Sequence, residues 1–235
     1  MKEIAKRVAL VGAGLVLALL VTEILLRIIH FSVPNFYEPD PRLGWSLQPG
    51  AQGWYTDEGR GFMEINSAGM RGSENKLAKP DDVYRIAVIG DSYSEAKQVP
   101  FDSTYTSLLP SRLESCGFQA GKRIETLNFG VSGYGTAQEL ILLRERAVRY
   151  QPDMVLLQFT GSNDVRNNSP VLEQTKIRPF FVLGADGTLH LDDSFATRPS
   201  FRRLFTPAWK VYRRVAPYSR LAQLVRAVQH KKDSK

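Results

Sequence analysis

Tyr84-Arg-Ile-Ala-Val-Ile-Gly-Asp-Ser-Tyr-Ser-Glu95 is the stretch that decides the fold of this chain. Its first six residues form a short apolar run rich in β-branched side chains, which predicts a strand covered on both faces of a parallel sheet. Gly90 then allows a sharp turn, and Ser92 stands where a helix should begin. A hydroxyl there lies at the carboxyl edge of the sheet, where open α/β folds bind ligands, and in the field of helix N–H groups. Ser92 is therefore either the N-cap of that helix or a nucleophile.

Two further segments repeat this pattern. Residues 124–130 and 153–159 are strand-like, and each is followed by a loop that contains glycine, at 131–136 and 160–164. Residues 138–150 between them predict an amphipathic helix whose apolar face holds Leu140, Leu143, Ala147 and Tyr150. Strand, helix and strand with short connectors predict a right-handed parallel crossover, so the three loops should converge at one edge of the sheet.

Together these three blocks resemble the SGNH (GDSL-type) hydrolase family. Gly90-Asp91-Ser92 is similar to the first family block, whose serine is the nucleophile. Gly133 in Ser132-Gly133-Tyr134 is similar to the second block, which supplies a backbone N–H. Asn163 in Gly161-Ser162-Asn163-Asp164 is similar to the third block, which supplies a side-chain amide. Each motif alone is a common turn or cap pattern. Their order and spacing, about one βα unit apart, make the combination specific over residues 84–168.

The resemblance implies a fold, a reaction and a site. The fold is a flavodoxin-like parallel sheet with helices on both faces, and the reaction is hydrolysis or transfer of an acyl ester, often acetyl on carbohydrate. Ser92 would attack the ester carbonyl, and its own N–H, the Gly133 N–H and the Asn163 amide would form the oxyanion hole. One such donor is worth about 3–4 kcal/mol. We expect no cofactor and no metal.

The fourth family element, an Asp-x-x-His motif that carries the general base, is missing from the sequence. The chain has three histidines. His30 closes the apolar N-terminal run, His190 follows an expected hairpin turn at Asp186-Gly187, and His230 precedes Asp233 in the reverse order. Without a base the hydroxyl of Ser92 is a poor nucleophile. Two alternatives to an active hydrolase therefore stay open: a catalytically weak or inactive protein that binds or assembles acyl sugars, and an envelope polysaccharide O-acyltransferase.

The number of strands favours an incomplete domain over a substituted base. A flavodoxin-like SGNH sheet needs about five parallel strands, and the sequence predicts three. After residue 168 come an expected hairpin at 177–191 and a basic helical region at 201–229. We therefore expect the parallel sheet to be incomplete at its C-terminal side.

Composition sets the outer limits of these interpretations. The chain has 235 residues, 43% of them hydrophobic and 23% charged, which suits one α/β domain and an anchor. Its single cysteine, Cys116, excludes an intrachain disulfide and a cysteine-rich metal site, and we expect it at the end of a helix over 105–115.

The N-terminal segment predicts a membrane anchor. Residues 8–29 would form a helix about 33 Å long, enough to cross a hydrocarbon core of about 30 Å. Lys2, Lys6 and Arg7 precede it, which predicts a cytoplasmic N-terminus. Glu23 and Arg27 are four residues apart and can pair near the outer interface. The alternative is a cleaved signal peptide, although no small-x-small cleavage site follows. We expect a single-pass protein of a bacterial inner membrane, its domain facing the periplasm or exterior.

The expected organisation has four parts. Residues 1–31 are the cytoplasmic stub and anchor, 32–80 a proline-rich extracytoplasmic extension, 81–170 the SGNH core, and 171–235 a hairpin insertion and a basic helical region. The net charge of +7 comes largely from this last part. An outward-facing domain argues against nucleic acid as a partner of this basic region. The region then either faces solvent or contacts anionic headgroups or an acidic polysaccharide. The expected partners are thus an acyl-ester small molecule or carbohydrate, and membrane lipid through the N-terminal helix.

Overall fold

The structure, a computed structural model, describes residues 1–233, with side chains as far as Gln229. The chain forms two compact units. One consists of residues 36–206. The other combines residues 1–35 with the segment that begins at Pro207, so the two ends of the chain belong to the same unit.

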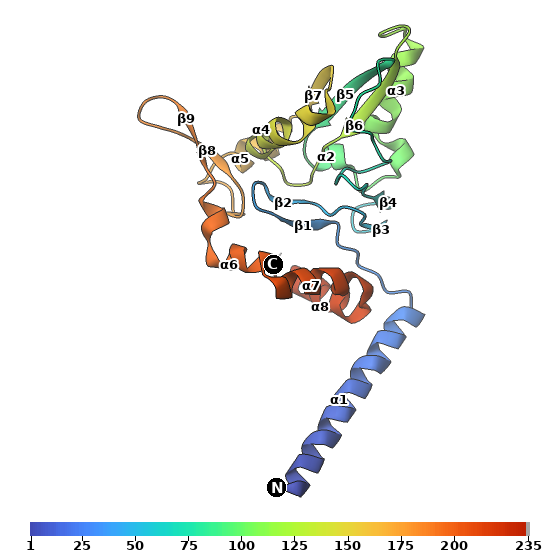
Figure 1. Cartoon of the computed structure of the whole chain (residues 1–235), viewed down its shortest axis with the longest axis vertical. Helices are drawn as coiled ribbons and strands as arrows, with labels where there is room; N and C mark the ends of the chain where they lie inside the picture. Colours follow the sequence, from blue (N-terminus) through green and yellow to red (C-terminus); the bar gives the residue numbers. More distant parts are fainter. Residues whose placement is uncertain (234–235) are drawn as a thin grey trace. The chain divides into compact units, whose positions relative to one another are not determined.

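The larger unit is built on a parallel three-stranded sheet (Figure 1). Its strands are β5 (Val83–Ile89), β6 (Arg123–Asn128) and β7 (Met154–Leu157), with β5 in the centre and β6 and β7 on its two sides. All three strands were predicted, and the parallel order agrees with the expected crossovers. The mixed α/β class with a parallel sheet is thereby confirmed.

Both faces of the central strand are buried because its side chains alternate between two clusters. Ile86 and Val88 pack with α3 (Tyr105–Ser115), which is the predicted helix with the predicted bounds and ends at the exposed Cys116. Ala87 and Ile89 belong to the larger cluster, which contains α4 (Thr136–Glu145). A period of two along a strand places alternate residues on opposite faces, so helices cover both sides of β5.

The predicted apolar face over residues 138–150 is confirmed in part, because Ala147 is buried in the larger cluster and Leu143 and Tyr150 pack against it, whereas Leu140 does not belong to it. The helix α4 ends at Glu145 and continues as a short 3-10 turn over Ala147–Tyr150. Its fully buried residues are Ala137, Gln138, Glu139, Ile141 and Leu142, whereas Leu140 and Leu143 are only partly buried. The helix lies between the sheet and a further layer, so its buried surface is wider than a single stripe and includes polar residues.

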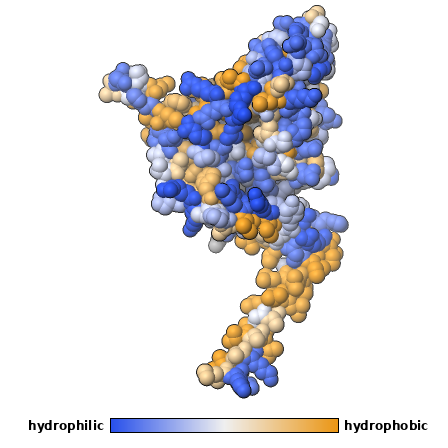
Figure 2. Space-filling view, in the orientation of Figure 1, coloured by the Kyte–Doolittle hydropathy of each residue, from blue (hydrophilic) through white to orange (hydrophobic). Residues whose placement is uncertain are grey.

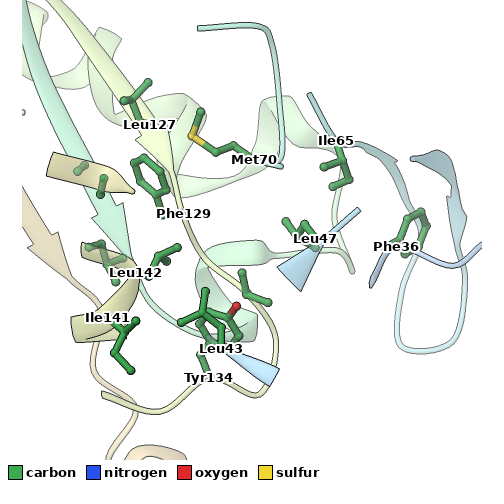
Figure 3. Packing of buried hydrophobic residues seen from close by; sticks show 14 of the residues in the cluster. Phe36, Leu43, Leu47, Ile65, Met70, Leu127, Phe129, Tyr134, Ile141 and Leu142 are labelled. Carbon is green, nitrogen blue, oxygen red and sulfur yellow. The ribbon is translucent and has the colours of Figure 1, made fainter. Parts of the chain in front are cut away.

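That further layer comes from the proline-rich segment before the sheet. It forms two antiparallel hairpins, β1 (Tyr37–Asp40) with β2 (Gly44–Leu47) and β3 (Gln52–Tyr55) with β4 (Gly61–Glu64). Apolar residues of this segment share one core with residues of β6, its following loop and α4 (Figure 3): Phe36, Leu43, Leu47, Ile65 and Met70 with Leu127, Phe129, Tyr134, Ile141 and Leu142. Hydrophobic packing therefore joins residues 36–80 to the sheet.

The outer edge of β7 is open. No other strand in the described part of the chain pairs with it on the side away from β5. The four side chains of β7 are between 37% and 47% exposed, although all are apolar. An apolar strand with a free edge is a pairing site for another strand.

After β7 the chain forms α5 (Gly161–Asn167) and then the predicted hairpin, β8 (Phe180–Leu183) with β9 (Leu189–Asp192). The Asp186-Gly187 turn and the position of His190 on the second strand are confirmed: the Asp186 carboxylate accepts from the Thr188 N–H, and Gly187 has φ +77°. The short helix α6 (Pro199–Arg202) follows.

The smaller unit contains α1 (Lys2–Ile28), α7 (Pro207–Val215) and α8 (Arg220–Asp233). Among the described residues, α1 is the one helix long and apolar enough to cross a membrane, with a mean hydropathy of 2.5 over 18 residues. Figure 2 shows its apolar surface, with polar residues at its N-terminal end. The predicted pair of Glu23 and Arg27 is confirmed, with 2.8 Å between carboxylate and guanidinium. Length and composition fit a membrane anchor or a signal sequence.

Candidate active site

Ser92 is the first residue of α2 (Ser92–Glu95), directly beyond the end of β5. Asp91 is the N-cap of this short helix: its carboxylate accepts a hydrogen bond from the Tyr93 N–H at 3.0 Å. Because Asp91 caps the helix, Ser92 is not needed for that role. Ser92 is half-buried, so its hydroxyl is accessible at the carboxyl edge of the sheet.

Asn163 lies beside the serine loop. It belongs to α5, after β7, and its side-chain Nδ2 donates to Asp91 Oδ2 at 3.0 Å. An amide nitrogen has two hydrogens, so the second remains available for a ligand. The structure thus brings the first and third predicted blocks together through the residue that precedes Ser92.

Gly133 lies in the loop after β6 and has φ +80°, a left-handed conformation that favours glycine. This loop is tied to both neighbours. The Ser132 N–H donates to the Glu95 carboxylate of α2, and the Gly133 carbonyl accepts from Asn167 Nδ2 of α5 at 3.4 Å. The carbonyl points into this contact with α5, and no described residue accepts a hydrogen bond from the Gly133 N–H. The second predicted block is thereby linked to the other two.

Polar side chains behind Ser92 hold α2 in place. The Ser94 hydroxyl lies 2.6 Å from the Tyr105 hydroxyl and donates to Gln158 Oε1 at 3.2 Å. Asn128 Nδ2, at the end of β6, donates to the Ser94 carbonyl at 2.7 Å. The strands β6 and β7 on either side of β5 therefore each end at or next to an amide side chain that forms a hydrogen bond with α2, the helix that carries Ser92.

Glu95 is a fully buried carboxylate in the same helix. It accepts from the Tyr37 hydroxyl at 2.7 Å as well as from the Ser132 N–H, and its backbone carbonyl accepts from the buried Arg71 at 2.8 Å. These bonds connect α2 with the hairpin layer and with the glycine loop. The carboxylate is paired on both oxygens, which makes its burial tolerable.

Glu139 is another buried carboxyl group, on α4. Glu139 of α4 is 1% exposed, and neither of its oxygens has a hydrogen-bond partner in the described part of the chain. Burial raises the pKa of Glu139 from its ordinary value of 4.5 to about 8, and the Asp164 and Asp91 carboxylates add to the shift. Burial also raises the pKa of Asp164. The hydrogen bond from the Thr160 N–H acts in the opposite direction, because it stabilises the charged carboxylate. The Glu139 side chain is therefore largely protonated at neutral pH.

Trp45 and Arg178 form a wall beside Gly133. Trp45 Nε1 donates to the Ser132 carbonyl at 3.1 Å, and its ring would lie 3.4 Å from a Cβ at Gly133. The guanidinium of Arg178 lies over the Trp45 ring, 5.0 Å from its centre. Arg178 is almost fully buried and 3.7 Å from the Glu173 carboxylate.

No histidine with a described side chain forms a hydrogen bond with Ser92. His190 instead contacts Thr188 and Asp186 within its own hairpin, at 2.9 and 3.2 Å, and its side chain is largely exposed. His30 belongs to the smaller unit. The His230 side chain lies outside the described part of the structure. Within the described residues, no group of three His, Cys, Asp or Glu side chains could hold a metal ion.

The predicted site residues lie at or near the carboxyl ends of neighbouring strands. A hydroxyl, an amide side chain and a glycine loop belong to three adjacent strand ends, held from behind by buried polar groups. The sequence motifs did not predict the supporting residues Glu95, Asn128, Gln158 and Asn167, nor the buried acid Glu139. For two of them the sequence held a signal: Asn128 and Gln158 are amide residues near the ends of otherwise apolar strand runs.

Comparison with known proteins gives one statistically supported similarity and no family assignment. No model of a known protein family matches the chain. The chain is similar to an arylesterase of Vibrio mimicus, with 29% identity over 86 residues. The match covers 37% of this chain and 41% of the arylesterase, so the chain spans about two fifths of that relative's length.

Proposed function

We propose that this chain carries an SGNH-type ester hydrolase site with Ser92 as nucleophile. The observation that carries the proposal is the 3.0 Å hydrogen bond from the Asn163 amide to Asp91, which sets the amide beside the serine loop. The similarity to an arylesterase supports the same class of chemistry. The half-buried position of Ser92 at the end of a central parallel strand supports it further.

In the proposed reaction, the Ser92 oxygen bonds to the carbonyl carbon of an ester, the ester C–O bond breaks, and the hydroxyl proton leaves with the alcohol or phenol. Water then attacks the acyl-serine, which releases the carboxylic acid and restores the Ser92 hydroxyl. The carbonyl oxygen becomes an oxyanion, which the Ser92 N–H, the Gly133 N–H and the second hydrogen of the Asn163 amide stabilise. Donors held rigidly before the reaction are effective because they need no reorganisation as charge develops. The hydrogen bonds of Asp91, Glu95 and Asn167 supply that rigidity.

The substrate class is an ester of a small molecule, with aryl acetates as the natural probes. Acyl groups on carbohydrate are the alternative substrate, and transfer to a sugar hydroxyl instead of water would make the protein an acyltransferase. One observation favours a second candidate function. Because the described histidines do not contact Ser92, a protein that binds acyl esters without turning them over has the same site.

Slow acetylation of Ser92 by p-nitrophenyl acetate is the expected signature of this site. An oxyanion hole without a base retains about 10³–10⁴-fold catalysis over water. Peptide mass spectrometry of the full chain should therefore find acetyl on Ser92 well before it appears on Ser162, an exposed serine in the first turn of the neighbouring helix α5. Asn163→Ala should slow this acetylation by about 10²–10³-fold, because it removes one oxyanion donor. Equal acetylation of Ser92 and Ser162 would contradict the proposal.

We further propose that α1 is an uncleaved single-pass anchor in a bacterial inner membrane, with the larger unit outside the cytoplasm. The basic residues before α1 and the absence of charge from Val8 to Thr22 support this orientation. Protein from cells should sediment with membranes and keep Met1 or Lys2, and external protease should reach residues 36–206 only after the outer barrier is opened. A soluble mature form that begins near Phe31 would show a cleaved signal peptide instead.

A further inference from the structure

The helix α7 has two chemically opposite faces. At 100° per residue four apolar side chains fall on one arc and the three basic side chains on the opposite arc, with Trp209 at the boundary between them. The apolar arc holds Ala208, Val211, Tyr212 and Val215, and the basic arc holds Lys210, Arg213 and Arg214. Val211 is 61% exposed and Val215 59% exposed, so no described part of the chain covers the apolar arc.

The segment after α7 is fixed to the C-terminal end of α1. The Glu23 carboxylate accepts from the Ser219 hydroxyl at 3.1 Å and from the backbone N–H groups of Arg220 and Leu221 at 3.0 and 2.9 Å. It therefore caps the N-terminus of α8 from another helix. Arg27 adds a bond of 2.7 Å to the Tyr218 carbonyl.

The same contacts set the depth of the α7–α8 segment along α1. Val215, Tyr218 and Leu221 line an open groove together with Val16, Leu19 and Leu20 of α1. Leu20 lies eight residues before the end of α1 at Ile28, which is about 12 Å along the helix axis. Interfacial helices bury their apolar face about 5–10 Å into the boundary between headgroups and acyl chains. The groove therefore spans this depth along α1 and reaches beyond it, with Leu20 at about 12 Å.

The chain that leaves α1 is held to α8 as well. Arg220 donates to the Ser32 hydroxyl at 2.8 Å, and Arg226 donates to the Val33 carbonyl at 2.9 Å. The Val33 N–H donates to Gln223 at 2.9 Å. The helix α8 therefore cannot separate from residues 32–33, which follow α1, without breaking several hydrogen bonds.

We propose that residues 207–229 form an arm that lies in the membrane interface and binds anionic lipid headgroups, an inference that rests on the proposed membrane anchor. Charge supports this occupant, because the segment contains five basic residues (Lys210, Arg213, Arg214, Arg220 and Arg226) and no acidic one. An acidic polysaccharide would neutralise the charge but leave the apolar arc in water. A second copy of this basic segment would be repelled. A bilayer with anionic headgroups satisfies both faces of α7.

The test uses the full chain in lipid nanodiscs, with a polarity-sensitive fluorophore on one cysteine. In a Cys116→Ser background, Leu15→Cys reports on the anchor and Val215→Cys reports on α7. The native Cys116 serves as the solvent control, because it is exposed in the larger unit. In nanodiscs containing phosphatidylglycerol, labels at positions 15 and 215 should emit at shorter wavelength and be quenched by spin-labelled lipid, whereas the label at Cys116 should not.

Charge reversal gives the second arm of the test. Combined Lys210→Glu, Arg213→Glu and Arg214→Glu should lower the equilibrium constant for lipid burial of the position-215 label by roughly fivefold or more for each residue, and high salt should act in the same direction. The matched control reverses three exposed basic residues of the larger unit, Lys76, Arg112 and Arg144, and should leave the label buried.

Each result separates the two proposals. A position-15 label that stays in water overturns the anchor. A position-15 label in lipid with a position-215 label in water overturns the arm and leaves the anchor standing. Movement of the position-215 label only on addition of an acidic polysaccharide, or an equal effect of both triple variants, also overturns the arm.

Discussion

Supplying a positioned histidine beside Ser92 will raise phenyl acetate hydrolysis by about 10²–10⁴-fold, the usual contribution of general acid–base catalysis. The physical reason is the proton of the Ser92 hydroxyl, which no described histidine is placed to accept. Fusion of a C-terminal segment that carries Asp-x-x-His should provide the acceptor, and free imidazole should provide a weaker one. The unmodified chain should barely hydrolyse the ester.

Matched variants make this result specific. The same fused segment with glutamine in place of its histidine should give no gain, and Ser92→Ala should abolish the gain of the intact segment. Hydrolysis is followed as phenol release, with the rate of the Ser92→Ala protein subtracted as background. Robust turnover by the unmodified chain that is lost on His190→Ala would contradict this expectation and would make His190 the base.

Glu139→Gln will stabilise the larger unit at pH 8 by up to about 4 kcal/mol and have little effect at pH 4.5. The folded pKa of Glu139, about 8, lies above the ordinary value of 4.5 that applies in the unfolded chain. Between these two values the folded state holds a proton that the unfolded state releases. Stability therefore falls as pH rises, by up to about 1.4 kcal/mol per pH unit, and the contribution is fully present only below about pH 4.5.

Two opposite effects act on the pKa of Glu139, and the desolvation that raises it outweighs the helix dipole that lowers it. Glu139 lies in the first turn of α4, where a negative charge gains about 0.3–1 kcal/mol from the helix N-terminus. That gain corresponds to less than one pKa unit. The rise in pKa from 4.5 to about 8 is much larger and has the opposite sign, because the side chain is 1% exposed and no described residue donates a hydrogen bond to either oxygen.

The measurement is urea unfolding of the full chain at pH 5, 6.5 and 8, followed by fluorescence of Trp45 and Trp54 in a Trp209→Phe background. Glu145→Gln is the control, because Glu145 is a half-exposed carboxylate on the same helix, paired with Arg42. Loss of that exposed ion pair should change stability by less than about 1 kcal/mol. Parallel pH profiles for Glu139→Gln and the unsubstituted chain would contradict the assignment of a neutral buried acid.

The sequence by itself determined the local elements. The three strands lie where apolar, β-branched runs were predicted at 84–89, 124–130 and 153–159, although the third is shorter than its predicted range and has an open edge. The helix over Tyr105–Ser115, the hairpin turned by Asp186-Gly187 and the apolar helix with its Glu23–Arg27 pair also followed from local pattern. In each case the signal is a period or a turn residue within a few positions.

The tertiary structure alone decided which distant residues meet. The hairpin layer packs on the sheet, Glu95 joins Tyr37 to the glycine loop, and Glu23 caps a helix that begins almost 200 residues later. Periodicity could not predict these contacts, because it reports which face of an element is apolar and not which polar group another element presents to it. The contacts between the segments that carry Ser92, Gly133 and Asn163 depend on both the sequence pattern and the tertiary structure. Parallel strand topology brings their loops to one edge, while the polar bonds of Asp91, Ser132 and Asn167 set the geometry there.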